Sequence, residues 1–509
     1  MFSRVKTAHV VGIDGILIDV EVYVASRGIP SFNIVGLADN SIKESKERVK
    51  ASLSNIKYNI FSNPITVNLA PADIKKEGTH FDLPIAIALL SAFNSFQVNM
   101  LDFLLLGELS LDGKIRGVNG ALPMAIEASK NGFKNIILPK ENVSEVKYIE
   151  SVNIYPFLHI SSLLAFLKGV NTVNPVKGEK FINLLNTKYK GPDFREVSNQ
   201  KFAKRCVEIA AAGMHNILMV GSPGSGKTMI AKRLPGILPD LEFNEALETT
   251  KIHSVAGILR KKRGLIIKRP FISPHHTSSD VAIIGGTKSA APGLVSLAHN
   301  GVLFLDEFLE FKRSVLEVLR QPLEEGIVTI SRAGKTVTYP STFILVAACN
   351  PCPCGFLWSK KRECRCSESQ IVKYQSRLSG PLIDRIDMHV KMEEIEFSEF
   401  KGNCKEESSE EIKKRVIRAH QIQKERHRDY PFKYNAHVDD KHINSLIQID
   451  GKIYDLLDKL CDRYGLSARS INKILKVART IADLNEEDSI KDNHLLEASK
   501  YRFLDTMNI

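Results

Sequence analysis

The sequence predicts an α/β protein with a P-loop nucleotide-binding core and a separate α/β domain in front of it. The first observation is the run Gly221-Ser-Pro-Gly-Ser-Gly-Lys-Thr228, which fits G-x-x-x-x-G-K-[ST] without a mismatch. An apolar segment, 217–220, precedes this run, and a helix-forming segment, 229–234, follows it. The second observation is a buried-strand pattern over 301–305 that ends in two carboxylates. The third is the alternation of strand and helix patterns through the first 170 residues.

The first domain is predicted from this alternation. The patterns predict strands over 18–24, 64–69, 103–106 and 135–138, and helices over 40–53, 82–93 and 121–130. Because 509 residues exceed the size of one ordinary core, we expect several domains. Their predicted bounds are an α/β domain over 1–170, a polar linker over 171–192, the P-loop core over 193–395 and a helical region over 396–509.

The glycine-rich loop is the predicted site of a nucleoside triphosphate. Its members are Gly221, Ser222, Pro223, Gly224, Ser225, Gly226, Lys227 and Thr228. Glycines let successive backbone N–H groups converge on phosphate oxygens, and the following helix presents its positive N-terminus. Lys227 can reach the β- and γ-phosphates, and the Thr228 hydroxyl can hold Mg²⁺.

Four further residues complete the predicted chemistry of hydrolysis. Asp306 can hold Mg²⁺ through water, and Glu307 can polarise the attacking water. Asn350, at the end of another apolar strand, can orient that water. A cation on the developing charge is often supplied by a neighbouring subunit, and we favour Arg385 for this role, with Arg377 as the second choice. The alternative for both arginines is an ordinary surface salt bridge.

Composition favours an anionic partner. The chain is 43% hydrophobic and 25% charged, as in ordinary globular proteins, and its net charge is +12. Nucleic acid is the leading candidate partner, and a basic protein with no such partner is the alternative. The first residues lack the apolar core of a signal peptide, and no apolar run reaches the length of a spanning helix, so we expect a cytoplasmic protein without membrane contact.

Two basic segments interrupt the core. The segment 258–295 holds the pair His275-His276 and a glycine-rich loop that contains Lys288. The histidines are interpreted as structural or phosphate-facing residues, with metal binding as the alternative. The segment 327–339 predicts a hairpin with a basic tip, where Arg332 and Lys335 suit a passing phosphate backbone. A solvated turn is the alternative.

Two close pairs of cysteines follow Asn350. They are Cys352, Cys354, Cys364 and Cys366, in the spacing C-x-C, nine residues, C-x-C. Four thiolates on a short loop can surround a structural Zn²⁺. Cys349 could replace one of the four, and free thiols or redox disulfides are the alternatives to zinc.

The first domain resembles the proteolytic domain of Lon-type proteases, with its ribosomal S5-like fold. The stretches "KKEGTHFDLPIAIALL" and "LGELSLDGKIRGVNGALPMAIEA" carry this likeness. The position of the nucleophilic serine falls on His80, close to Asp82, and that of the lysine falls at or near Leu122. Because neither a hydroxyl nor an amine stands there, the resemblance implies a Lon-like fold without peptidase chemistry.

The remainder resembles the ATPase subunit of magnesium chelatase and its bacterial relatives of the ComM (YifB) type. The stretches "EIAAAGMHNILMVGSPGSGKTMIAKRLPGILP", "RPFISPHHTSSD", "GGTKSAAPGLVSLAHNGVLFLDEF", "AACNPCPCG", "SGPLIDRID" and "LSARSINKILKVARTIADL" carry it. The order of domains is that of ComM-type proteins. The resemblance implies an AAA+ core, a helical lid whose Arg469 reaches the γ-phosphate, ATP as the nucleotide, and a hexameric ring with ATP sites shared between subunits.

Three functions compete on this basis. ComM-type resemblance implies a ring helicase that drives branch migration when incoming single-stranded DNA recombines in natural transformation. A chelatase-like ATPase that remodels a partner for metal insertion would instead be indifferent to DNA. A Lon-like protease would cleave peptides, which the missing serine and lysine argue against.

Overall fold

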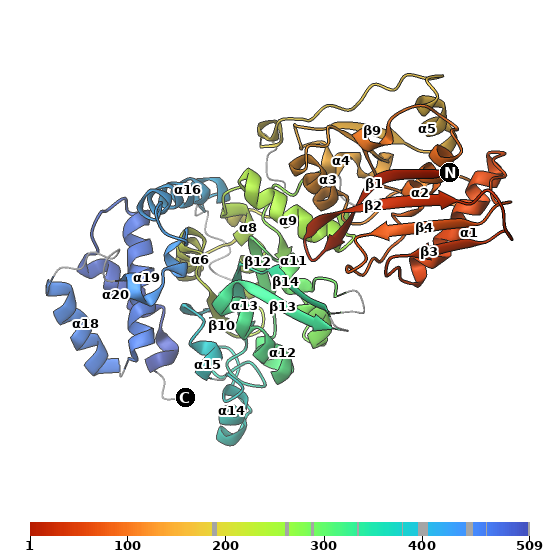
Figure 1. Ribbon diagram of the computed structural model, residues 1–509. Helices are drawn as coiled ribbons and strands as arrows, with labels where there is room; N and C mark the ends of the chain where they lie inside the picture. Colours follow the sequence, from red (N-terminus) through yellow and green to blue (C-terminus); the bar gives the residue numbers. More distant parts are fainter. Residues whose placement is uncertain are drawn as a thin grey trace. The chain divides into compact units, whose positions relative to one another are not determined.

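The computed structural model describes residues 1–185, 191–259, 264–286, 290–332, 335–378, 380–394, 406–443, 451–464 and 466–506 (Figure 1). The chain forms two compact units. The first comprises Met1–Asn186 and Glu242–Ile267, and the second comprises Thr187–Leu241 and Lys268–Ile509. Among the described residues, no helix has the length and apolar character needed to cross a membrane.

The first unit is built on a seven-stranded mixed sheet of order β3-β4-β2-β1-β5-β8-β9. Its strands are β1 (Phe2–Val11), β2 (Asp14–Val24), β3 (Phe32–Val35), β4 (Ile65–Ala70), β5 (Phe103–Leu105), β8 (Asn135–Pro139) and β9 (Asn153–Phe157), with a small separate pair β6 (Glu108–Leu109) and β7 (Ile115–Arg116). Its helices within the first 186 residues are α1 (Asn40–Asn55), α2 (Asp82–Ala92), α3 (Ala121–Lys130), α4 (Val143–Val146) and α5 (Ile160–Leu167). All seven elements predicted for the first domain are confirmed, with bounds shifted by a few residues.

Helices cover both faces of this sheet. Successive strand residues point to opposite faces, and Leu105 and Ile137 accordingly pack with α1, α2 and α5, whereas Leu104 and Ile136 pack with α3 and α4. Helix α2 is buried at nearly every position, which explains why its sequence is apolar without a polar stripe.

The positions compared with peptidase residues belong to the core of this unit. His80 is buried and stacks on His9, with ring centroids 5.4 Å apart. Asp82 is buried, and its Oδ2 accepts from Arg48 Nε at 2.6 Å. Leu122 is buried in α3. The assignment to a Lon-like fold stays a prediction.

A segment from the middle of the sequence completes the first unit. Helix α9 (Phe243–Val255) packs on α3, and Leu247 and Leu265 join the apolar cluster around that helix. Ser254 Oγ donates to Glu145 Oε2 at 2.6 Å, and Gly120 N donates to Ser254 O at 3.1 Å. The chain therefore leaves the second unit after Leu241 and re-enters it at Lys268.

The second unit contains a five-stranded parallel sheet of order β11-β12-β15-β10-β16. The strands are β10 (Ile217–Val220), β11 (Phe271–Ile272), β12 (Gly301–Leu305), β15 (Phe343–Cys349) and β16 (Met388–Lys391). The helices before residue 400 are α6 (Lys201–Gly213), α7 (Lys227–Ala231), α8 (Leu234–Ile237), α10 (Asp280–Ile284), α11 (Leu294–Leu297), α12 (Arg313–Val318), α13 (Arg320–Glu325), α14 (Glu368–Gln375) and α15 (Gly380–Ile383). The predicted α/β class is thus confirmed.

Among the described residues after this sheet, the α-helices are α16 (Ser409–Arg426), α18 (Gly451–Tyr464), α19 (Ala468–Leu484) and α20 (Asp492–Lys500). Helix α16 is rich in charged residues but also has an apolar face, because Ile412 and Val416 are buried in the core shared with the sheet. Asp483, fully buried in α19, accepts from both guanidinium ends of Arg426 at 2.5 and 3.0 Å and from Arg479 at 3.2 Å. These contacts fasten α16 to α19. Their assignment to a lid stays a prediction.

Candidate nucleotide-binding site

Three strands of the parallel sheet end at the same edge. Val220 of β10 is registered with Cys349 of β15, and Leu305 of β12 is registered with Ala347 of β15. The segments that leave these strands begin with Gly221, Asn350 and Asp306. Because parallel strands present their carboxyl ends together, the sheet gathers the predicted P-loop, the carboxylates and the amide in one place.

The P-loop adopts a conformation that requires its glycines. Gly224 and Gly226 have φ values of +81° and +91°, the left-handed region that favours glycine. A Cβ on either residue would meet no atom within 4 Å, so backbone conformation rather than space selects glycine here. Gly226 caps α7, so the loop leads directly to a helix N-terminus.

Lys227 lies buried beneath the loop. Its Nζ donates to Gly221 O at 2.5 Å, to Ser222 O at 3.0 Å and to Asn350 Oδ1 at 3.3 Å. Burial lowers the pKa of Lys227, and the charge of Asp306 acts in the opposite direction. The contact with Asn350 joins two residues that the sequence predicted separately.

Thr228 and Asp306 also meet. Thr228 Oγ1 donates to Asp306 Oδ2 at 2.7 Å, and Asp306 Oδ1 accepts from Glu307 N at 3.0 Å. A hydroxyl oxygen and a carboxylate oxygen in contact form the donor set that Mg²⁺ prefers beside a nucleotide. The residues present therefore fit the predicted ion.

Glu307 is held by a residue that sequence reasoning did not assign to it. Its Oε2 lies 2.8 Å from His276 Nδ1, in the segment that follows β11. The ring of His275 packs against that of His276 in a tilted arrangement with centroids 4.2 Å apart, and the Nδ1 of His275 lies 2.9 Å from Thr277 Oγ1. The backbone of Glu307 has a φ of +53°, a left-handed conformation that turns it away from the strand direction. The predicted water-polarising carboxylate thus has an imidazole partner.

The three predicted arginines contact other groups of the same chain. Arg385 forms an ion pair with Glu324 of α13. Arg377 Nη1 donates to Leu309 O at 3.0 Å, and Arg469 Nη1, at the start of α19, lies 3.5 Å from Asp384 Oδ2. Their roles toward a nucleotide stay predictions, because such roles depend on a neighbouring subunit or a bound phosphate.

The predicted basic hairpin is present. Strands β13 (Ile327–Arg332) and β14 (Lys335–Pro340) pair antiparallel, and Arg332 is registered with Lys335 at their ends. Tyr339 OH donates to Ala290 O at 2.9 Å and anchors the base of the hairpin. The two residues between Arg332 and Lys335, and also Lys288, lie outside the described residues.

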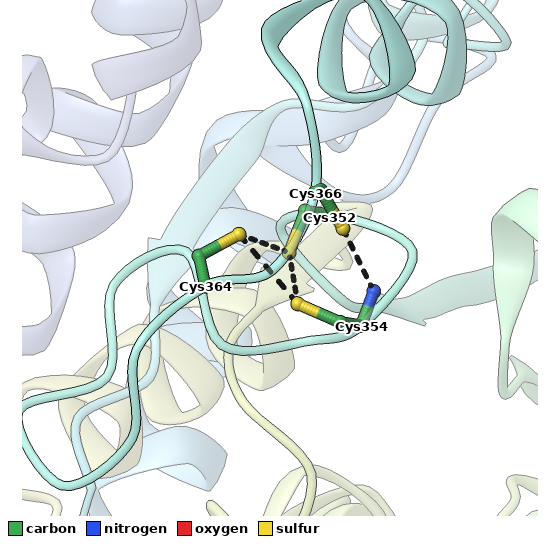
Figure 2. A group of neighbouring side chains, drawn as sticks. All are labelled: Cys352, Cys354, Cys364 and Cys366. Atoms are coloured by element: carbon green, nitrogen blue, oxygen red, sulfur yellow. Dashed lines mark hydrogen bonds between the residues drawn. The ribbon is translucent and has the colours of Figure 1, made fainter.

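The four predicted cysteines converge (Figure 2). The Sγ atoms of Cys352 and Cys354 are 3.4 Å apart, and Cys364 Sγ lies 3.7 Å from the first and 3.5 Å from the second. With Cys366, the four sulfurs lie within 4.8 Å of one another and are free thiols. Four sulfurs about 2.3 Å from one Zn²⁺ would be about 3.8 Å apart, so the cluster fits a tetrahedral ion.

The pKa values of the thiols in the cluster diverge: burial raises the pKa of Cys352 to about 12, whereas that of Cys354 is lowered. The backbone N–H groups of Phe356 and Arg365 lower the pKa of Cys354 to about 6, which favours the thiolate that binds metal. Among the described residues, this is the only group of three or more side chains arranged to hold an ion. Cys349, considered as a substitute ligand, is buried in β15 and lies outside the group.

Comparison with known proteins identifies the family of this arrangement. The family model described as magnesium chelatase, subunit ChlI, matches residues 193–400, that of subunit ChlI of Mg-chelatase matches 20–142, and that of the ChlI C-terminal region matches 406–502. The YifB protein of Escherichia coli (strain K12) is 41% identical over 512 residues, covering 100% of this chain and 98% of its own. Competence protein ComM of Haemophilus influenzae is 39% identical over 498 residues, covering 96% and 95%.

The chain belongs to the ComM/YifB-type, magnesium-chelatase-like family. The magnesium-chelatase subunit ChlI of Bigelowiella natans is a more distant relative, 26% identical over 200 residues that cover 35% of this chain and 49% of its own. The ComM/YifB-type family is AAA+ ATPase-like, so the chain is a ComM-like ATPase with ATP and Mg²⁺ as its expected ligands.

Proposed function

We propose that the chain is the subunit of a hexameric ring ATPase that moves on single-stranded or branched DNA and drives branch migration during recombination of incoming DNA. The observation that carries the ATP-driven part is the contact of Thr228 with Asp306 at 2.7 Å, beside Lys227 and Asn350. The DNA-directed part is supported by similarity along nearly the whole chain to a protein named Competence protein ComM.

Each residue of the site has a proposed task in hydrolysis. The backbone amides of the P-loop and Lys227 bind the phosphates, while Thr228 and Asp306 hold Mg²⁺, which neutralises charge on the phosphate oxygens. Glu307 accepts a hydrogen bond from the attacking water, and Asn350 orients that water. Arg385, or Arg377 in its place, acts on the nucleotide of the neighbouring subunit, and Arg469 contacts the γ-phosphate.

The proposed DNA contacts are two residues of the hairpin and Lys288. Arg332 and Lys335 are registered at the end of a two-stranded element whose base is anchored by Tyr339. The backbone pairing puts residues 332 and 335 at the end of the hairpin, which suits contact with phosphates in a ring pore. Lys288 belongs to the proposed contact set on sequence grounds alone.

The four-cysteine cluster is proposed to hold a structural Zn²⁺. The sulfur distances of 3.4–3.7 Å are close to those expected around a shared ion. The ion would close the base of the loop that runs from Cys354 to Cys364 and so fix that loop on the core.

The ATPase rate with and without DNA tests the proposal. We expect single-stranded and branched DNA, each at low and at 150 mM salt, to stimulate hydrolysis, with weaker stimulation at the higher salt because phosphate contacts release counterions. Lys227→Ala provides the background rate. A rate that ignores every DNA at low salt would contradict the motor and favour the chelatase-like alternative, in which a protein partner stimulates the ATPase.

A further inference from the structure

A cavity of about 660 Å³ borders the first two residues of the P-loop, Gly221 and Ser222. The turn before α6 forms one wall, where Gln200 Nε2 donates to Glu393 O at 2.7 Å and to Ser225 O at 3.3 Å. Its volume is in the range of sites that enclose small organic ligands. A nucleotide whose phosphates occupy the loop must place its ribose and base beside the loop, and this cavity offers the space.

Another part of the lining comes from residues 352–366, which we call the cysteine hairpin. Trp358, between the two cysteine pairs, lines the cavity and is half-buried. Lys391 Nζ lies 4.8 Å from the centroid of its ring, and Phe503 meets the ring edge-on at 6.1 Å. A held indole offers a flat face on which a base can stack.

The charge of the cavity suits an anionic ligand. Four lysines line it against two glutamates: Lys201, Lys360, Lys361 and Lys391 against Glu393 and Glu394. Lys360 and Lys361 belong to the cysteine hairpin, so this hairpin supplies both the aromatic surface and half of the cations. A ligand with an aromatic base and a phosphate chain matches both features.

Trp358 lies on the loop whose ends the four thiols bring together. Nine residues separate Cys354 from Cys364, and the sulfurs close this loop at its base. The loop also touches the P-loop, since a Cβ on Gly355 would lie only 2.5 Å from Pro223 Cδ. Asn350, two residues before Cys352, contacts Lys227. A metal that fixes the thiols would therefore fix one wall of the cavity.

We propose that the cysteine hairpin forms part of the nucleotide site, with Trp358 stacking on the base of the bound nucleoside triphosphate, and that zinc at the four thiols maintains the affinity for nucleotide. This inference rests on the proposed function, because it requires a triphosphate in the P-loop. It adds a base-binding residue and a metal dependence to that site.

The chain contains a single tryptophan, Trp358, which makes its own emission the direct test. Titration of the zinc-loaded full chain with ATP and Mg²⁺ should change this emission. The change should be half-complete at the dissociation constant measured by calorimetry. Trp358→Ala should weaken ATP binding by about fivefold or more, the loss expected for one base–aromatic stack, and Trp358→Phe should recover most of it.

The metal arm uses the same binding measurement. Removal of zinc by a chelator, or Cys364→Ser, should weaken ATP binding to about the level of Trp358→Ala. In the Trp358→Ala background, either change should cause little further loss of ATP affinity. Undiminished affinity in the zinc-free protein would overturn the metal dependence.

Failure of the inference can be separated from failure of the ATPase site. If calorimetry detects ATP binding that Lys227→Ala abolishes, but emission and the Trp358→Ala affinity are unchanged, Trp358 is not part of the site. If an oligodeoxythymidine changes the emission and ATP does not, the wall is a nucleic-acid surface and the inference is overturned. If calorimetry detects no ATP binding to the zinc-loaded or to the zinc-free wild type, the proposed function itself fails.

Discussion

Replacing His276 with alanine should raise the ATPase rate measured without DNA. His276 Nδ1 lies 2.8 Å from Glu307 Oε2 and occupies an oxygen of the carboxylate that we assign to the attacking water. The two side chains are 31% and 56% exposed, so the pair is only partly shielded from solvent. Pairs of this kind contribute about 0.2–1 kcal/mol. If that energy must be overcome before Glu307 acts, its removal raises kcat by a factor of about 1.4 to 5.

The measurement is kcat at saturating ATP and Mg²⁺ for the wild type, His276→Ala and His275→Ala. His275 is the matched control, because its ring packs against His276 but its Nδ1 contacts Thr277 instead of the carboxylate. In a Glu307→Gln background, His276→Ala should have no effect, since the interaction is already lost. An unchanged or lower kcat for His276→Ala, or an equal rise for His275→Ala, would refute the assignment of His276 as a restraint on Glu307.

The other predictions concern hydrolysis, DNA, metal and stability. Glu307→Gln should retain ATP binding in calorimetry and lower kcat by about 10²–10⁴-fold, and a wild-type rate would remove Glu307 from its role. Lys335→Ala should weaken DNA binding and reduce the slope of log K against log salt by about 0.7–0.9, and an unchanged slope would exclude a phosphate contact. Metal analysis should find about one zinc per wild-type chain and none in Cys352→Ser/Cys364→Ser; a metal-free wild type would count against the site. Asp483→Ala should lower the free energy of unfolding in urea by about 3–5 kcal/mol because two arginines lose a buried partner, and a change below about 1 kcal/mol would contradict this account.

The sequence was sufficient to predict the groups that follow buried strands. The P-loop, Asp306 and Asn350 each come directly after a short apolar run, and parallel strands bring such positions to one edge. The same logic predicted the hairpin, because two β-prone runs flank a turn. The spacing of the cysteines indicated a cluster, since short loops can bring such pairs together.

Contacts made by loops could not be predicted in this way. His276 reaches Glu307 from the segment after β11. In the sequence, His276 is one of two adjacent histidines in a basic segment, and nothing there indicates a contact with Glu307. In the sequence, Trp358 is an isolated aromatic residue, whereas in the structure it lines the same cavity as Gly221. The packing of α9 with the first unit was not predicted either, because the sequence around Leu247 and Leu265 does not indicate which element these residues contact. The role of Arg385 toward a neighbouring subunit stays a prediction, because a single chain does not contain that neighbour.

Each of the two groups that we assign to the attacking water is a short stretch of sequence away from another part of the protein. On one side, the segment that ends at Ile267 belongs to the first unit, and the next residues form β11, whose Phe271 is registered with Val302 of β12. That path reaches His276, the partner of Glu307, nine residues after Ile267. On the other side, Asn350 is followed within two residues by Cys352. His276 is thus joined to the first unit by nine residues of chain, and a metal bound at the thiol cluster would hold the chain two residues from Asn350.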